Sequence, residues 1–333
     1  MAEATATRPP PIEIGLHAAI VAVAEQQPLI LVVPPHGAST AQEPDNLPFG
    51  PFNPLAHRTF ETGLREWVAE QTALKLGHVE QLYTFGDRGR HAAPGDTGPH
   101  LVSVGYLALT RIGDGSAAAL ARAGALWRRW YEFFPWEDWR DGRPALLDEV
   151  LLPALMRWSG AGSREPTARR ALGRRERIHL AFGDTKRWDE ERALDRYELL
   201  YEAGLVIEAE RDGRPLFDRD VARVAGAPMR FDHRRILATA ISRLRAKLKY
   251  RPVVFELMAD EFTLTELQRT VEAISGRHLH KQNFRRLVEG AALVEPTGQT
   301  APQTRGRPAA LFRFRHEILT ERPAPGFRLG ARG

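Results

Sequence analysis

Two carboxylates, Glu66 and Glu70, lie four residues apart within the stretch "LREWVAEQTAL", residues 64–74. Residues 56–72 have the apolar spacing of an amphipathic helix, with Trp67 and Val68 on its inner face. Because residues i and i+4 share one face of a helix, both carboxylates would point the same way. Hard carboxylate oxygens can hold a divalent cation that activates water, and equally they can be solvated charges on an exposed helix.

The residues around this pair resemble the box of the Nudix hydrolases. "LPFG" precedes the helix that begins with "LREWV". In that family a glycine and a glutamate are followed by Arg-Glu-aliphatic-x-Glu-Glu-x-Gly, and the glutamates hold cations that activate water against a pyrophosphate. The resemblance therefore implies a nucleotide pyrophosphate as the ligand.

The box can be aligned in two registers. With Arg65 as its arginine, Glu66 and Glu70 keep two acidic positions, and Ala69 and Thr72 replace a glutamate and the glycine. With "EQTAL" as a variant of "EETGL", the replaced positions, two ligands and the glycine, are Trp67, Gln71 and Ala73. The sequence does not decide between the registers, and each loses at least two acidic positions.

We therefore expect no catalytic residues and no metal cluster, with Glu66 and Glu70 at most binding a cation weakly. A pocket that has lost its catalytic ligands can still bind its nucleotide, because binding and transition-state stabilisation are separable. No cofactor is required on this interpretation, and Mg²⁺ would enter only together with bound nucleotide.

The elements that must position this helix are short strands. Residues 16–33 read as two strands joined by a polar turn at "EQQ", and residues 79–87 and 101–112 read as two more. Residues 116–134, 143–158 and 188–206 have helical spacing, with an exposed linker at 160–175. The expected fold is α+β: a disordered tail (1–11), a Nudix-like α/β/α sandwich (12–115), a helical middle segment (116–228) and a winged helix-turn-helix (229–333).

The last of these modules is basic. Residues 230–315 carry 17 Lys and Arg against 8 Asp and Glu, whereas the whole chain has a net charge of only +5. An amphipathic helix at 231–250 is followed by a second helix with a Thr263–Glu266 capping box ended by Gly276, and by a third that Gly290 closes. Two strands joined by a basic loop come next, which is the order of a winged helix.

A helix that enters the major groove needs polar donors near its N-terminus and cations that face the phosphates. The third helix and the wing loop "TRGRPA" offer both. The predicted DNA-binding residues are Thr263, Thr265, Lys281, Gln282, Asn283, Arg285, Arg286, Arg305 and Arg307. A helical dimerisation domain with a solvated basic face is the structural alternative.

A degenerate Nudix domain followed by a winged helix resembles the Nudix-related transcriptional regulators of NAD metabolism. "VEQLYTFGDRGR", "FTLTELQRTVEAISG", "HKQNFRRLVEG" and "GRPAALFRF" carry the resemblance. It implies a dimeric repressor of NAD-metabolism genes that binds double-stranded DNA and responds to ADP-ribose or a related nucleotide. The ligand-binding residues that it implies are Arg65, Glu66, Glu70, Phe85, Gly86, Asp87, Arg88 and Arg90. The helical middle is longer than the family's usual link.

Composition limits the other possibilities. The chain has no cysteine, which excludes disulfides, thiolate metal sites and cysteine nucleophiles. No apolar run reaches the roughly 18–20 residues of a membrane span, so a cytoplasmic protein without a membrane partner is expected. An active ADP-ribose or nucleotide pyrophosphatase with a regulatory C-terminal domain is the alternative function, and a protein-interaction module is the third.

Overall fold

A computed structural model of the 333-residue chain describes residues 11–33, 44–74, 76–87, 89–90, 98–113, 116–161, 172–183, 188–301 and 308–321. The wing-loop residues Arg305 and Arg307, the loop residue Arg88 and most of the predicted tail lie outside these ranges. No helix in the described ranges combines the length and the apolar character needed to cross a membrane.

The N-terminal half is built on a mixed β-sheet with the order β4-β5-β1-β2-β6. Its strands are β1 (Ile12–Ala24), β2 (Gln27–Val32), β4 (Val79–Phe85), β5 (His100–Leu109) and β6 (Leu126–Arg129), and β3 (Phe49–Pro51) pairs with the start of β1. β1 runs parallel to β5 and antiparallel to β2. Glu25 and Gln26 both have positive φ, which gives the tight β1–β2 hairpin the twist of its strands.

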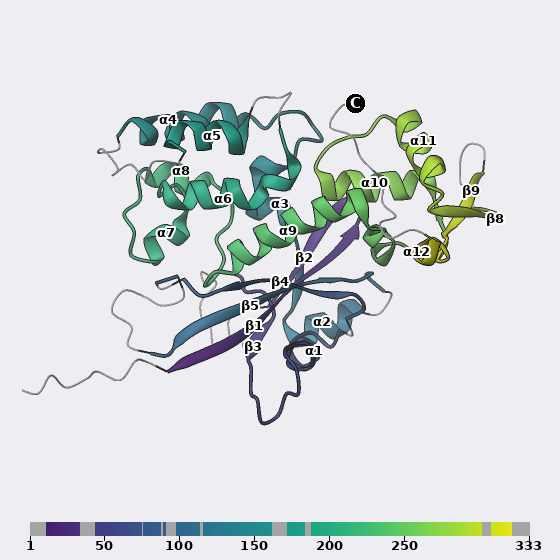
Figure 1. Cartoon of the computed structure of the whole chain (residues 1–333), viewed down its shortest axis with the longest axis horizontal. Helices are drawn as coiled ribbons and strands as arrows, with labels where there is room; N and C mark the ends of the chain where they lie inside the picture. The colour runs from purple at the N-terminus through teal and green to yellow at the C-terminus, as the bar shows by residue number, and fades with distance from the viewer. Residues whose placement is uncertain are drawn as a thin grey trace, which may run out of the picture.

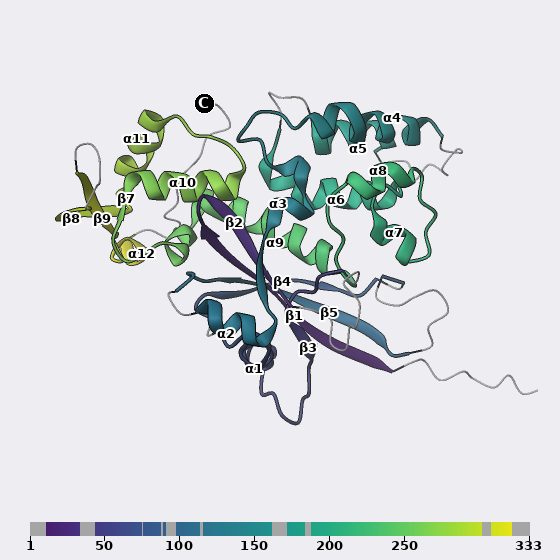
Figure 2. The ribbon, with the colours of Figure 1, turned by 180° about the vertical axis from the view of Figure 1, so that it is seen from behind.

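Helices cover both faces of this sheet (Figures 1 and 2). On one face, Leu16, Ala18 and Ile20 of β1 pack beneath α1 (Phe60–Thr72) and α2 (Ser116–Ala123). On the other face, Ala19 and Val21 contribute to a larger core that continues into the helical middle and the C-terminal module. Successive side chains of β1 thus point alternately into the two helix-covered faces of the sheet. The predicted α/β/α sandwich is confirmed.

The described residues of the helical middle form nine short helical segments between α2 and α9. They are α3 (Trp130–Phe133), the 3-10 turn Pro135–Glu137, the π-helical turn Leu147–Leu151, α4 (Leu152–Gly160), α5 (Arg174–Phe182), the 3-10 turn Glu190–Arg192, α6 (Ala193–Glu202), α7 (Ile207–Arg211) and α8 (Arg219–Val224). Figure 1 shows α4 to α8 gathered at the end of the molecule away from the winged helix.

The prediction of one helix over residues 116–134 was wrong. Gly124 has φ 73°, which ends α2, and residues 126–129 instead form β6, the edge strand paired with β2. Trp127 packs on the α1 side of the sheet, while Trp130 is fully buried on the other side. The helical spacing was misleading because an apolar run this short fits a strand equally well. The sheet therefore extends past residue 115, and the four predicted domain ranges stay predictions.

The C-terminal module consists of α10 (Leu264–Ser275), α11 (Lys281–Ala291) and a small sheet of β7 (Phe262–Thr263), β8 (Val294–Ala301) and β9 (Ala309–Phe314). The strand order is β7-β9-β8, and all pairings are antiparallel. A 3-10 segment, Val253–Leu257, leads into the module, and α12 (Ile318–Glu321) follows it. This is the predicted winged helix-turn-helix.

The long helix α9 (His233–Tyr250) joins the two halves of the molecule. It lies across the second face of the sheet and contacts α6 on one side and α10 on the other (Figure 1). Its predicted apolar stripe, Ile236, Leu237, Ala240, Ile241, Leu244 and Leu248, is completely buried. α9 is therefore part of the core beneath the sheet as well as a support for the winged helix.

Candidate nucleic-acid interface and ligand pockets

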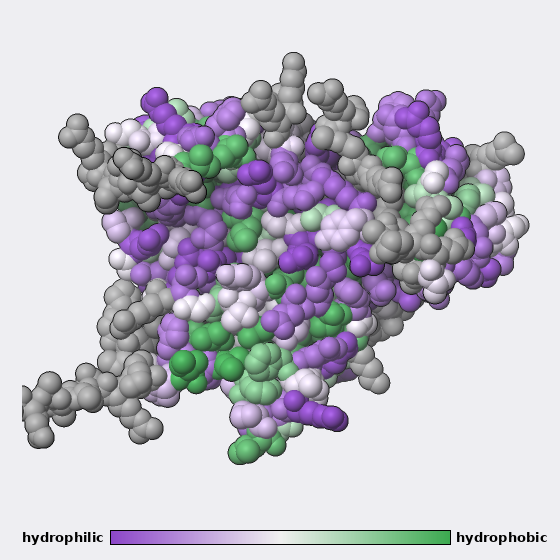
Figure 3. All heavy atoms as spheres, viewed as in Figure 1, coloured by the Kyte–Doolittle hydropathy of each residue, from purple (hydrophilic) through white to green (hydrophobic). Residues whose placement is uncertain are grey.

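The helix α11 presents a polar face to solvent. Phe284 and Val288 are buried against the module's core, and Lys281, Gln282, Asn283, Arg285 and Arg286 are exposed. Figure 3 shows hydrophilic side chains gathered over this helix, at the upper right of the molecule. In the described part of the chain no carboxylate pairs with these three cations, and Arg286 contacts only the Asn283 amide, at 3.4 Å. They are therefore available to a polyanion.

Five basic residues of α9, which belong to the same charge excess, each pair with a carboxylate of the protein. Arg234 pairs with Glu208, Arg235 with Asp232, Arg245 with Glu137, Lys247 with Glu80 and Lys249 with Glu191. The charges of these five cations are neutralised within the protein. Part of the basic character that sequence counting assigned to residues 230–315 is thus neutralised within the protein, whereas the three cations of α11 are exposed.

Local capping holds the two helices of the motif in place. Thr263 accepts a hydrogen bond from the Glu266 N–H in the predicted capping box, and Gly276 ends α10 with φ 71°. Thr263 is buried with its hydroxyl engaged in this cap, whereas Thr265 is exposed. The prediction that Gly290 closes α11 was wrong: the helix continues to Ala291, and Ala292 takes the left-handed conformation at its end.

The turn between α10 and α11 depends on Glu272. Its carboxylate accepts hydrogen bonds from the Leu279 N–H at 2.7 Å and the Gln268 side chain at 2.9 Å, and it lies 3.2 Å from His278. Only 8% of Glu272 is exposed. One buried carboxylate therefore fixes the angle at which α11 leaves α10.

The helical middle holds the C-terminal end of α10. The Tyr131 hydroxyl donates to the Ala273 carbonyl at 2.8 Å, and the backbone N–H of Trp139 donates to the Gly276 carbonyl at 2.7 Å. Arg245 of α9 donates to the Ile274 carbonyl at 2.9 Å. A cation at this end also complements the negative end of the helix dipole. Backbone carbonyls at the end of α10 thus attach the winged helix to the middle segment and to α9.

Glu137 is the centre of this attachment. It is completely buried and accepts two hydrogen bonds from Arg196 of α6, at 2.5 and 2.9 Å, and one from Arg245, at 2.5 Å. Burial alone would raise the pKa of Glu137, but the two guanidinium groups outweigh it, so the pKa lies below its ordinary value. Three helices that are distant in sequence meet at this carboxylate.

This pKa shift predicts acid sensitivity. A carboxyl group whose folded-state pKa is depressed contributes stability that is fully present above its unfolded-state value of 4.5 and is lost as the pH falls through the lower, folded-state pKa. We therefore expect the free energy of unfolding to fall steadily below about pH 4.5. Urea denaturation between pH 7 and pH 3 measures it, and a Glu137→Gln variant should show a shallower decline over that window.

On the opposite face of the sheet, the structure decides the register of the Nudix-like box. Ala73 follows α1 with φ 56°, the left-handed conformation that glycine adopts most easily. This places Ala73 at the glycine position of the box, with the buried Val68 at its aliphatic position. Trp67 and Gln71 then occupy two ligand positions, and Glu70 is the carboxylate that remains.

Both replacement residues bind strand β3 instead of a cation. The Trp67 indole donates to the Pro51 carbonyl at 2.9 Å, and Gln71 exchanges two hydrogen bonds with the backbone of Phe49. The Trp67 ring also fills the space above Gly50, where an added Cβ would lie 2.2 Å from it. These residues do not fit a catalytic magnesium site, and no group of three acidic or histidine side chains suited to a metal occurs among the described residues.

The predicted ligand residues do not converge on one site. Arg65, Glu66 and Glu70 lie on α1: Arg65 donates to the carbonyls of Leu76 and Gly77, and Glu66 lies 3.3 Å from His57. Phe85 is buried on the other face, beneath the Arg235 guanidinium. Gly86 follows it at the end of β4, where its carbonyl lies 3.1 Å from the His100 ring. The sheet thus separates the two groups.

Asp87 and Arg90 join a network of ion pairs with the helical middle and α9. Arg235 pairs with Asp87 and lies 2.5 Å from Glu198 of α6, and Arg90 binds Glu198 at 2.8 Å and Asp232 at 3.5 Å. Burial raises the pKa of Asp232 despite these two cations. The loop after β4, α6 and the start of α9 are therefore electrostatically connected.

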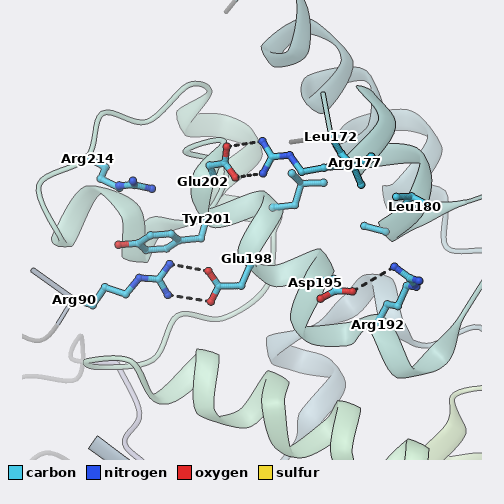
Figure 4. A pocket seen from close by; sticks show the side chains of 12 residues that line it. Arg90, Leu172, Arg177, Leu180, Arg192, Asp195, Glu198, Tyr201, Glu202 and Arg214 are labelled. Carbon is cyan, nitrogen blue, oxygen red and sulfur yellow. Dashed lines mark hydrogen bonds and ion pairs between the residues drawn. The ribbon is translucent and has the colours of Figure 1, made fainter. Parts of the chain in front are cut away.

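Arg90 also borders a pocket of about 510 Å³ between α5 and α6. Figure 4 shows its arginine and carboxylate side chains around Tyr201, with Arg90 on one side of the ring and Arg214 on the other. Arg90 lies 3.7 Å from the ring centroid and Arg214 5.2 Å from it. Except for Arg90, the lining residues belong to the helical middle.

Comparison with known proteins agrees with the geometry of the C-terminal module. Residues 254–314, which hold α10, α11 and the three strands, match the family model described as the NrtR DNA-binding winged helix domain. Residues 254–314 are an NrtR-type winged helix domain. The match begins after α9, which is consistent with the packing of α9 in the core beneath the sheet.

Over 84 residues the chain is 43% identical to the ADPR responsive transcriptional repressor NtrR of Acinetobacter baylyi. That alignment covers 25% of this chain and 33% of the relative, so the chain spans about a third of the length of the curated protein that it matches. The resemblance to the Nudix-related regulators is thereby confirmed, with the NrtR-type winged helix as its most specific part.

The whole fold is similar to solved structures of Shewanella oneidensis NrtR. One of them, in complex with a 27mer DNA, has a TM-score of 0.52 and 20% identity, and the alignment covers 92% of this chain and 95% of that chain. A second structure of the same protein gives a TM-score of 0.52 and 20% identity over 91% of this chain and 94% of that chain. At this identity the likeness shows the fold alone, a sandwich followed by a winged helix.

Sequence reasoning missed several residues that organise these sites. Glu137 and Glu198 have partners that are distant in sequence, Glu272 binds the turn that follows its own helix, and Arg214 lies in a stretch without a motif. The one available signal was the long helical middle itself, which the sequence analysis left without a role. A segment that carries paired charges is a candidate for positioning the module that follows it.

Proposed function

We propose that the protein is a ligand-responsive transcriptional regulator, acting as a repressor of NAD-metabolism genes, whose effector is ADP-ribose or a related nucleotide. It would act in the cytoplasm as a homodimer on a double-stranded DNA operator. The observation that carries the proposal is the NrtR-type winged helix with exposed, unpaired cations on α11. The name of the Acinetobacter relative, an ADPR responsive transcriptional repressor, supports the effector class.

Two winged helices of a dimer would contact half-sites about one helical turn apart, roughly 34–36 Å. The effector would favour an arrangement in which the recognition helices have a different spacing. It must bind that arrangement more tightly, because a ligand with equal affinity for both arrangements shifts nothing. The backbone attachment of α10 to the middle segment gives a route by which a movement of the sensor reaches α11.

The test is a titration of labelled promoter fragments from NAD-pathway genes with the full-length protein, with and without ADP-ribose. We expect specific binding in the nanomolar range at physiological salt, roughly 10³-fold or more tighter than to unrelated DNA, and a weaker complex when ADP-ribose is added. Failure to bind any duplex at low and at moderate salt would favour the protein-interaction module instead.

We also propose that the Nudix-like domain has no catalytic role, since Trp67 and Gln71 hold β3 where the box would supply metal ligands. Incubating the purified protein with ADP-ribose and Mg²⁺ should give no product at ordinary enzymatic rates of about 1–10 per second. Turnover at such rates would favour a nucleotide pyrophosphatase with a regulatory C-terminal domain.

A further inference from the structure

The pocket between α5 and α6 has a distribution of charge that the proposed function does not use. Three carboxylates follow one another along α6, and each meets an arginine from a different element. Asp195 lies 3.5 Å from Arg192, Glu198 binds Arg90 through both oxygens, and Glu202 binds Arg177 through both oxygens. Within each of these three pairs the positive and negative charges cancel.

Arg214 is the additional cation of this pocket. In the described part of the chain it forms no ion pair, and its guanidinium faces the ring of Tyr201. The opposite face of that ring is covered by Arg90, and the Tyr201 hydroxyl donates to Asp212 at 2.9 Å. Tyr201 thereby lies between two guanidinium groups, and the arginines that line the pocket outnumber its carboxylates by one.

The rest of the lining is apolar. Leu199 and Ala181 are buried in its floor, whereas Leu172 and Leu180 are 46% and 43% exposed. Large aliphatic side chains left half-exposed beside a cavity are typical of a surface that a ligand covers. A volume of about 510 Å³ falls within the range of small-molecule sites, roughly 300–1,000 Å³.

We propose that this pocket binds a small organic phosphate. The phosphate oxygens would be held by the Arg214 guanidinium, whose planar fork suits two oxygens at once, and the body of the ligand would cover Leu172 and Leu180. The site belongs to the helical middle and requires neither DNA binding nor a nucleotide on α1. The phosphate group could belong to the proposed effector itself or to a separate nucleoside monophosphate.

Isothermal titration of the full-length protein with ADP-ribose, AMP and adenosine distinguishes these sources. We expect AMP or ADP-ribose to bind, and adenosine, which lacks the phosphate, to bind at least about tenfold more weakly. Arg214→Ala should weaken binding of the phosphate ligand by at least about tenfold, as should Leu180→Glu, which places a negative charge against it. The control is Arg223→Ala, an exposed arginine on α8 that does not line the pocket.

Arg214-dependent binding of ADP-ribose would make this pocket the effector site, and Arg214-dependent binding of AMP alone would make it a second site. Equal affinities of the wild type and Arg214→Ala for both phosphate ligands, or equal binding of adenosine and AMP, would overturn the proposal. Promoter binding by Arg214→Ala without ligand should equal that of the wild type, because Arg214 lies between α7 and α8, which Figure 1 shows at the end of the molecule away from α11. A failure of DNA binding in the wild type would contradict the proposed function alone.

Discussion

Glu137→Gln should lower the free energy of unfolding by about 3–5 kcal/mol. The amide removes the negative charge that Arg196 and Arg245 share, and both guanidinium groups are fully buried with no solvent to compensate them. Removing one partner of a buried ion pair is costly because the desolvation of the remaining charge is no longer offset. Urea denaturation at pH 7, followed by circular dichroism, measures the shift in midpoint.

The control for this variant is Asp260→Asn. Asp260 also pairs with an arginine, Arg111, at 2.8 Å, but its side chain is 90% exposed, so the expected change is below about 1 kcal/mol. A Glu137→Gln variant as stable as this control would show that the triad is not the attachment that the geometry describes. DNA binding measured well below the unfolding midpoint should also weaken, since Arg245 positions the end of α10.

The double variant Arg285→Ala, Arg286→Ala should produce the largest loss of function. Each arginine is exposed on α11 and pairs with no carboxylate in the described ranges. We expect each lost contact to cost about 1–3 kcal/mol of DNA affinity if it reaches a base edge. A lost phosphate contact should instead lower the slope of log affinity against log salt by about 0.9. Fluorescence anisotropy with a promoter fragment at several salt concentrations separates the two contributions.

Arg175→Ala provides the matched control for charge, because Arg175 is an exposed arginine on α5, at the other end of the molecule from α11. Its affinity and salt slope should equal those of the wild type. Unchanged affinity and slope in the α11 double variant would remove these arginines from the interface. The fold of the double variant should be intact, since Phe284 and Val288, which hold α11 in place, are unaltered.

The separation of the predicted ligand residues shows where a resemblance between motifs falls short. Arg65 matched the box in one register, yet its guanidinium binds the carbonyls that follow α1. Arg90 was among the residues expected to bind the ligand, and in the structure it binds Glu198 and stacks on Tyr201. Ligand binding by any of these residues stays a prediction. The sheet lies between the group on α1 and the group after β4, so the two groups do not form one site.

The sequence by itself determined the local features of this protein. The Thr263–Glu266 cap, the glycine end of α10, the buried stripe of α9 and the polar face of α11 were all readable because they depend on residues within a few positions of one another. Composition and order along the chain then indicated a winged helix behind a sandwich.

Only the tertiary structure decided which long-range partners those elements find. Residues 126–129 became a strand because β2 offered a free edge, and the positive charges of α9 were neutralised by Glu80 and Glu137, which are distant in sequence. Ala73 fixed the register of the box through a backbone angle. Pairing energy and desolvation depend on which groups the folded chain brings within a few ångströms, and no local pattern records that.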